Sequence, residues 1–408
     1  MNLPSITVPD KHLKQRYGTA AKMQGLFFAS TLVAIIMLVV LLITIVDQSM
    51  GLTAVEYKID PALLSSQPID TLKRDELINI LSDNMTSQRL RTLERDKPLN
   101  QRSRDELEAL VIERVVDPQV LASWKLFESL FDRAEIEAGV AKSYPNAFLE
   151  FRSWLNLGFL SRNMSSRPEL AGVRAALKGS LLLILIAILF AFPIGIGAAV
   201  YLEEYNQGRS WVQRIIQTNI DNLAGVPSII YGILGLALFV RALSPITSGS
   251  IFGTQQFSGR TILSGGLTLG LLILPVLIIN AQEAIRAVPQ SLRQASYGLG
   301  ATRWQTTWHH TLPAALPGIL TGSILGISRA IGETAPLIVV GASTFISSDP
   351  TGIFSSFTAL PIQIYNWTSR PQDQFRNIAA AAILVLLISL LSLNAIAILL
   401  RNKYSKQD

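Results

Sequence analysis

The feature that most constrains how this chain can fold is a long apolar run near its start. Residues 25–46 read GLFFASTLVAIIMLVVLLITIV, without one charged side chain. As a helix, about 20 such residues cross the roughly 30 Å of hydrocarbon in a bilayer. Further runs follow residue 177, and the sequence therefore predicts an all-α polytopic membrane protein with six transmembrane helices. The six runs cover residues 25–46, 177–201, 219–243, 262–284, 314–345 and 377–400.

The segment 47–172, between the first and second runs, differs in composition from the rest of the chain. Of the 29 acidic and 35 basic residues in the sequence, 20 acidic and 16 basic ones lie between Asp47 and Glu169, so this segment has a net charge of −4. Its apolar side chains recur at helical spacing, and Ser103 followed by Glu106 matches a helix capping box. We therefore expect a mostly helical insert outside the membrane, without a catalytic motif.

Basic residues at the two ends of the chain predict its orientation. Four precede the first run and three lie in the tail. The positive-inside rule then places residues 1–24 and 401–408 in the cytoplasm and the insert 47–172 on the other side. Arg174 and Lys178, at the outer end of the second run, oppose this trend. A signal peptide is the alternative for the first run, but the run is too long and lacks a cleavage pattern, which favours an uncleaved anchor.

The composition also excludes several kinds of site. The chain has no cysteine, so disulfides and thiolate sites cannot form. Its three histidines include one adjacent pair, and we expect no metal site. There is no G-x-x-x-x-G-K-[ST] loop for ATP and no nucleophile with a matching base. We therefore expect neither a catalytic subunit nor a bound cofactor, and nothing in the charge pattern indicates nucleic-acid binding.

The loop 288–313 is the most informative stretch between two runs. Two short helical segments, 290–299 and 302–311, flank Gly298 and Gly300, which can adopt the positive φ of a sharp bend. The pattern predicts a helical elbow. Its second arm carries two tryptophans at i, i+4, Trp304 and Trp308, which share one face. Such an aromatic patch suits docking to a protein, and equally the lipid headgroup layer.

The spacing of this loop resembles the EAA loop of ABC-transporter inner-membrane permeases. Gln294-Ala295-Ser296 is followed by Gly300 six residues after Gln294, and then by Leu312-Pro313. Gln294 replaces the usual acid and Ser296 the second alanine. In that family the loop forms a coupling helix in a cleft of the ATPase subunit. The resemblance implies ATPase coupling by Gln294, Ala295, Ser296, Gly300, Trp304, Trp308, Leu312 and Pro313.

Three flanking stretches narrow the resemblance to the phosphate-specific, PstA-type permease subunits of bacterial inner membranes. They read NLAGVPSIIYGILG at 222–235, AVPQSLRQAS at 287–296 and SRAIGETAPL at 328–337. The resemblance implies a five-helix type I permease core over 173–400, preceded by an anchor and a periplasmic insert. It also implies ATP-driven phosphate import with three kinds of partner. These are a second, paralogous permease, a cytoplasmic ATPase dimer that holds ATP and Mg, and a periplasmic phosphate-binding protein.

Arg329 and Glu333 lie inside an apolar run, where each charge costs roughly 2.5 to 3.5 kcal/mol. Four residues apart on a helix, they could simply pair. They could also pack against a partner permease, with Gly326 and Gly332 permitting close approach. In the functional alternative, Arg329 offers donors to a passing oxyanion and Glu333 keeps binding transient. Pro336 is expected to bend the helix beside them.

The resemblance favours the functional alternative and implies a substrate path at Arg329, Glu333 and Thr334. Arg241 is a weaker candidate, since it could instead snorkel to the membrane surface. The motif Arg-Ala-x-Gly-Glu is shared among oxyanion importers, so import of sulfate, molybdate or phosphonate remains an alternative. An ion-coupled secondary carrier is a further one, because intramembrane charges also suit ion coupling.

Overall fold

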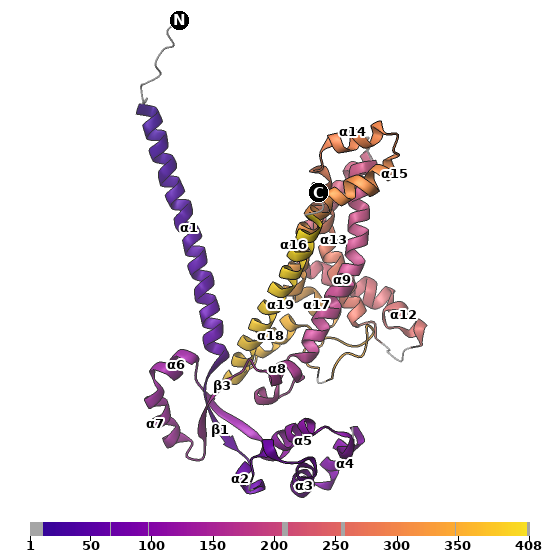
Figure 1. Cartoon of the computed structure of the whole chain (residues 1–408). Coiled ribbons are helices and arrows are strands. Elements are labelled where there is room, and N and C mark those ends of the chain that lie inside the picture. The colour runs from indigo at the N-terminus through magenta and orange to yellow at the C-terminus, as the bar shows by residue number, and fades with distance from the viewer. Residues whose placement is uncertain are drawn as a thin grey trace.

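The computed structural model describes residues 11–65, 67–96, 98–205, 211–253, 258–346 and 348–405. Figure 1 shows a bundle of long helices, a helix α1 (Lys11–Ser49) that stands apart from it, and a lobe formed by the insert where α1 and the bundle converge. Over the apolar window of α1 no residue is buried, as expected for a helix surrounded by lipid.

Five helices in the described ranges are long and apolar enough to cross a membrane, and they correspond to five of the six predicted runs. The five are α1, α9 (Arg174–Val200), α13 (Ile262–Arg286), α16 (Leu312–Gly332) and α19 (Asp373–Ser405). Two of them adjoin a π-helical turn. Helix α9 continues into η5 (Tyr201–Tyr205), and α16 is preceded by α15 (Arg303–Thr306) and η8 (Thr307–Thr311).

The third predicted run, 219–243, is not one straight helix. It lies in α10 (Trp211–Ala224) and α11 (Ser228–Gly235), which are bent by 107° against each other, and in the π-helical η6 (Leu236–Ala242). Pro227 explains the break, because it has no N–H for the helix ladder and disfavours helical backbone in the preceding residue. The count of six spans is reached only when this bent pair is taken as one.

The fifth predicted run, 314–345, is also interrupted. Helix α16 ends at Gly332, and the short helix α17 (Ala335–Val340) begins after a two-residue gap. Pro336 occupies the second position of α17, where a missing N–H costs nothing. The expected bend is therefore a complete break, located before the proline.

Small residues let α9 and α13 approach closely in the middle of the bundle. A Cβ atom on Gly266 of α13 would lie 2.6 Å from Cβ of Ile186 and 3.1 Å from the carbonyl oxygen of Leu183, both on α9. Similar contacts surround Gly270, where a Cβ would lie 2.6 Å from Phe190. Glycine at such positions permits tight packing between membrane helices.

The insert is helical, as expected, but it also contains a sheet that the sequence did not predict. Strand β1 (Met50–Tyr57) pairs antiparallel with β2 (Pro118–Ser123) and with β3 (Phe148–Ser153), so the strand order is β2-β1-β3. Thr53 lies opposite Ser123 on one side and Glu150 on the other. The main helices of the insert are α2 (Pro61–Leu64), α3 (Arg74–Asn84), α4 (Ser87–Asp96), α5 (Arg104–Val111), α6 (Leu126–Phe131), α7 (Arg133–Ser143) and α8 (Leu157–Ser161).

The insert is packed firmly against the bundle. Apolar side chains from both parts share one core that includes Val55, Trp154, Trp367 and Phe375. Helix α18 (Leu360–Thr368) contributes Trp367 to that core. Within the insert, the predicted capping box is present: the Ser103 hydroxyl accepts from the Glu106 amide at 3.2 Å, and the Glu106 carboxylate accepts from the Ser103 amide at 3.0 Å.

Arg174 and Lys178, the two cations that oppose the orientation trend, have a structural partner. Asp349, in the loop between α17 and α18, accepts from Nε of Arg174 at 3.0 Å and from Nζ of Lys178 at 2.5 Å. Burial alone would raise the pKa of Asp349, but the hydrogen bonds from Lys178 and Arg174 outweigh burial and hold the pKa below its usual value. These cations therefore fasten a loop to the start of α9.

Replacing Gly266 with valine should destabilise the bundle, because the added carbons overlap Ile186. We expect a loss of about 1 to 3 kcal/mol, typical of overpacking, visible as a lower thermal midpoint of the detergent-solubilised protein. Gly197→Val is the matched control, since a Cβ there meets no atom within 4 Å. Equal midpoints for the two variants would contradict the close packing of α9 and α13.

Candidate functional site

The loop 288–313 forms the predicted elbow at one end of the bundle (Figure 1). Helix α14 (Gln290–Gly298) ends just before Gly300, which has a φ of +84°. The second arm starts at Thr302, whose hydroxyl accepts from the Gln305 amide at 3.3 Å in a capping box. Gly298 remains in helix α14, so only Gly300 supplies the left-handed backbone of the bend.

A buried ion pair fixes the first arm of the elbow to the end of a membrane helix. Arg293 of α14 donates to Oε1 of Glu204 from Nη2 at 2.8 Å and from Nε at 3.1 Å. The side chains are only 11% and 6% exposed. Arg293 also donates to the carbonyl oxygens of Ile285 and Val288, at 2.8 and 2.7 Å. It thereby ties α14 to the last turn of α13 and to the turn that follows it.

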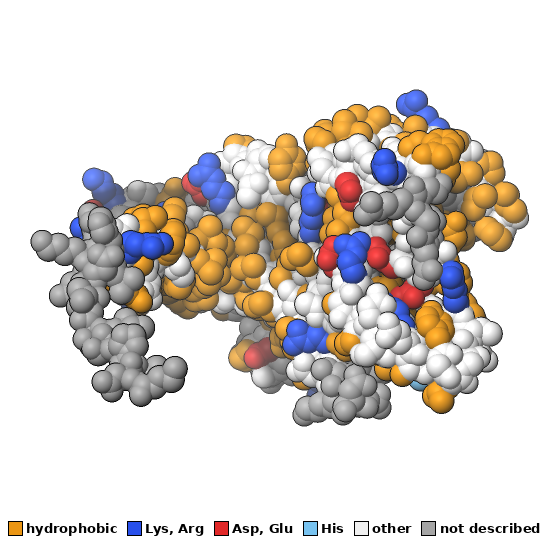
Figure 2. Space-filling view, turned by 90° about the horizontal axis from the view of Figure 1, so that it is seen from above, with side chains coloured by type: hydrophobic (Ala, Val, Ile, Leu, Met, Phe, Trp, Pro, Cys, Tyr) orange, Lys and Arg blue, Asp and Glu red, His pale blue; other side chains and the backbone are white. Residues whose placement is uncertain are grey.

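Two further contacts stiffen the same region. The hydroxyls of Ser296 and Thr306 lie 2.9 Å apart and are buried, so they join the two arms of the elbow. Arg286, at the end of α13, donates to Glu203 at 2.6 Å. Figure 2, which views this end of the molecule, shows basic and acidic side chains side by side among apolar ones. The sequence analysis missed Glu203 and Glu204, although two adjacent acids at the end of an apolar run were a signal for them.

Trp304 and Trp308 form one aromatic face, as their spacing predicts. Their rings stack with centroids 5.4 Å apart and an angle of 14° between the planes. They border an apolar hollow of about 640 Å³ between the second arm and the end of α9, where Pro193 and Tyr205 also line it. The patch therefore faces a hollow beside a membrane helix.

The outer face of the elbow carries other side chains. Gln294 and Ala295 are exposed on α14, whereas Ser296 is buried in the contact between the arms. Leu299, at the tip, is 91% exposed. The sequence analysis did not single out Leu299, although an apolar residue between two glycines of a predicted bend was a usable signal. Leu312 and Pro313 begin α16, directly after the second arm.

Arg329 and Glu333 form an ion pair at the end of α16 and not in the middle of a helix. Nε of Arg329 lies 3.4 Å from Oε1 of Glu333, which follows the last helical residue. Arg329 is half exposed, whereas Glu333 is 16% exposed. Helix α16 is 21 residues long, so the pair stands about 30 Å from the elbow. The guanidinium has donors that Glu333 does not use.

The two interrupted helices meet close to this pair. A Cβ on Gly232 of α11 would lie 2.7 Å from Cα of Pro336 in α17, so the two backbones are nearly in contact. Tyr231, next to Gly232, packs in one buried apolar cluster with Ala330 of α16 and Leu337 of α17. Thr334 lies in the gap between α16 and α17. The ion pair and Thr334 thus lie beside α11, the helix that follows the break at Pro227.

Arg241 lies elsewhere. It belongs to η6, nine residues beyond Gly232, and its side chain is exposed. In the described part of the chain no hydrogen bond or ion pair joins it to Arg329 or Glu333. The structure therefore does not place Arg241 with the other candidates for the substrate path. The described residues also contain no group of three or more His, Cys, Asp or Glu side chains that could hold a metal ion.

Replacing Glu204 with glutamine should loosen the elbow, because Arg293 would become a buried charge without its counterion. Removing one partner of a buried pair costs about 3 to 5 kcal/mol. We expect faster amide hydrogen exchange across α14. Glu203→Gln is the matched control, since its partner Arg286 is 58% exposed and such pairs contribute about 1 kcal/mol or less. Equal exchange in the two variants would show that the buried pair does not hold the elbow.

Comparisons with known proteins identify the family of this chain. A family described as binding-protein-dependent transport system inner membrane component matches residues 175–406. The phosphate transport system permease protein PstA 1 of Mycobacterium tuberculosis is 37% identical over 232 residues, which cover 56% of this chain and 70% of that protein. PstA of Yersinia pestis is 34% identical over 241 residues, covering 58% and 76%.

Among solved structures, an inward-facing methionine ABC transporter, MetNI, aligns with a TM-score of 0.42 at 19% identity, covering 58% of this chain and 94% of that one. The family match includes both the elbow and the Arg329–Glu333 pair and takes in more than half of the sequence. The chain therefore belongs to the inner-membrane components of binding-protein-dependent transport systems.

Proposed function

We propose that this chain is the permease subunit of an ATP-driven phosphate importer. The observation that carries the proposal is the elbow, an exposed bend fixed by the buried Glu204–Arg293 pair to the ends of membrane helices. Such a bend suits the transfer of motion from a cytoplasmic protein to the bundle. The names of the PstA relatives support phosphate as the cargo. Because the Arg329–Glu333 motif is shared among oxyanion importers, import of another oxyanion, such as sulfate, is the alternative.

The proposed partner at the elbow is an ATPase dimer that carries ATP and Mg, because this sequence contains no phosphate-binding loop of its own. Gln294, Ala295, Gly300 and Leu299 would contact it, since they lie on the outer face of the bend. Ser296 would act indirectly by joining the arms. In this proposal Trp304 and Trp308 contribute to the border of the contact, where the hollow beside α9 begins.

The proposed substrate path runs past the interrupted helices. Arg329 has unused donors and is half exposed, so it can bind an oxyanion briefly. Glu333, which already accepts from Arg329, competes with the anion and prevents permanent capture. Thr334 adds a hydroxyl in the gap between α16 and α17. Backbone breaks at such a place allow the helices to move relative to each other.

The remaining partners and the orientation follow from the same proposal. A second permease, paralogous to this chain, would complete the path, and a phosphate-binding protein would deliver the anion on the side of the insert. Residues 1–24 and 401–408 would then lie in the cytoplasm and the insert 47–172 in the periplasm. The chain itself would be non-catalytic.

Gly300→Val should detach the ATPase subunits while the protein still inserts into the membrane. Valine is disfavoured at the φ of +84° that the bend requires, although a Cβ there meets no atom within 4 Å. We expect a large loss of ATPase in copurification. Gly298→Ala is the control, because Gly298 is helical and has the same free space. Unchanged ATPase association in Gly300→Val would contradict the coupling role of the elbow.

Arg329→Ala should abolish phosphate uptake and leave assembly intact, since the anion loses its charged donors. The measurement is uptake of labelled phosphate by proteoliposomes that contain the whole complex, with and without ATP. Ser328→Ala serves as a neighbouring control, because the Ser328 hydroxyl is directed at Asn394, at 2.7 Å. Normal uptake by Arg329→Ala would refute the path. ATP-independent uptake by the unaltered complex would instead indicate a secondary carrier, and uptake of sulfate alone another substrate.

A further inference from the structure

We propose that the insert contains a binding site for a free tetrahedral oxyanion such as phosphate, in a hollow of about 390 Å³ between α4 and the turn η3 (Ile112–Val116). Cationic side chains from four separate segments of the chain line the hollow. They are Lys58 after β1, Arg89 on α4, Arg114 on η3 and Arg167 in the loop before η4 (Pro168–Leu170).

The lining leaves an excess of positive charge. The two acidic side chains that line the hollow are Glu113 and Asp117, so four cations against two acids give a net charge of +2. Arg89 has no ion pair or side-chain hydrogen bond with any residue that the structure describes. Among the described residues, Arg114 forms an ion pair only with its sequence neighbour Glu113, at 3.2 Å, and both are well exposed. Arg89 and Arg114 therefore have donors available for a ligand.

Asp117 forms ion pairs with two of the cations that line the hollow. With a φ of +50° it has a left-handed backbone, the single such case outside glycine in the described ranges. This conformation is disfavoured for residues with a side chain and persists where the surroundings require it. Its carboxylate pairs with Arg167, which also donates to the Pro118 carbonyl at 2.8 Å, and lies 3.8 Å from Nζ of Lys58. Asp117 thereby positions two cations before a ligand arrives.

The chemistry of the lining favours an oxyanion. Guanidinium groups present planar sets of donors that match the oxygens of phosphate or sulfate. In Figure 1 helices α4 and α5 lie beyond the ends of the long bundle helices, so the hollow is outside the length covered by the apolar helices. The hollow is also small for a protein segment, so a free anion is the occupant that we infer.

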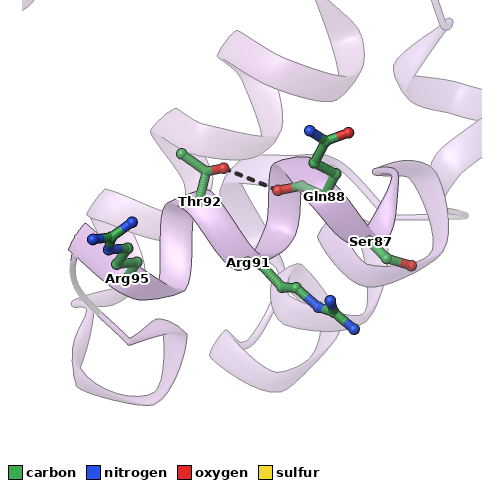
Figure 3. Close-up of a pocket in the computed structure, with 5 residues that line it drawn as sticks. All are labelled: Ser87, Gln88, Arg91, Thr92 and Arg95. Atoms are coloured by element: carbon green, nitrogen blue, oxygen red, sulfur yellow. Dashed lines mark hydrogen bonds between the residues drawn. The ribbon is translucent and has the colours of Figure 1, made fainter.

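A second basic hollow on the same helix lacks this convergence and provides a control. It is lined by residues of α4 alone, including Arg91 and Arg95. Figure 3 shows these two side chains pointing apart, while Thr92 is engaged in a hydrogen bond to the carbonyl of Gln88. Arg91 and Arg95 thus carry the same total charge as Arg89 and Arg114, but they do not form a common set of donors.

The test measures equilibrium binding of labelled inorganic phosphate to the full chain in nanodiscs of uncharged lipid at low ionic strength, where electrostatic binding is strongest. Arg329→Ala is the common background, because it removes the donor proposed for the membrane path, and two double variants are compared with it: Arg89→Gln with Arg114→Gln, and the control Arg91→Gln with Arg95→Gln. We expect saturable binding that the first variant weakens about tenfold or more, because charge-assisted hydrogen bonds are lost. The control should remain within about twofold. Hydrogen exchange near α4 and η3 should slow when phosphate is added.

Three results would overturn the proposal. They are the absence of saturable binding with or without Arg329, an equal loss in both double variants, which would indicate net charge alone, and saturable binding that requires Arg329, which would place the anion in the membrane path. The proposal does not depend on phosphate import. If uptake fails while binding to the insert persists, the proposed transport function is wrong and the site in the insert is not.

Discussion

The contact between Glu204 and Arg293 is the interaction on which the geometry of the elbow depends. Taking two charges out of water costs several kcal/mol per ion, and their attraction offsets this only when the remaining donors are also satisfied. Arg293 meets that condition by donating to Ile285 and Val288, at the end of α13. One side chain thus joins α9, α13 and α14. The direction of the elbow is set by membrane helices and not by the helical propensity of the loop.

The helices of the same bundle are interrupted at two places, and a proline accompanies each interruption. Pro227 prevents α10 and α11 from forming one straight helix, and Pro336 begins the short helix α17 after α16 has ended. Irregular backbone is tolerated within a membrane protein only where it is buried in protein or lines a polar space. The close approach of Gly232 to Pro336 packs α11, which follows the first interruption, against α17, which follows the second. An ion pair beside them makes that place polar, as the proposed anion path requires.

The sequence predicted what depends on local pattern and missed what depends on distant partners. Apolar length identified five straight spans, and the spacing of Gly300 and Trp304 identified the elbow. A hydropathy average over a sequence window contains no information on the direction of a helix, so it could not reveal the bend at Pro227. The sheet was missed because β1 is a short buried segment, which periodicity cannot distinguish from a helix, and its partner β2 is more than 60 residues away.

In the candidate site, too, local spacing was predictable and contacts between distant residues were not. The spacing of Arg329 and Glu333 indicated that they could pair, which the structure bears out. Their position at a helix end depends on the break before Pro336, and the partner of Arg293 lies 89 residues away. Neither could be read from a local window. Arg241 satisfied the same compositional criterion as Arg329, yet η6 carries it away from the pair, because the bend at Pro227 redirects that segment.

Helix α9 connects the insert to the elbow as one continuous element. At its start, Val173 and Ala176 belong to the core shared with the insert, and at its far end η5 carries Glu204. The 27 residues of α9 span about 40 Å. Because the insert also hydrogen-bonds to α19, through Ser123 and Asn377 at 2.9 Å, it cannot rotate freely about α9. Any displacement of the insert against the bundle must therefore either break that shared core or be transmitted along α9 to the contact with Arg293.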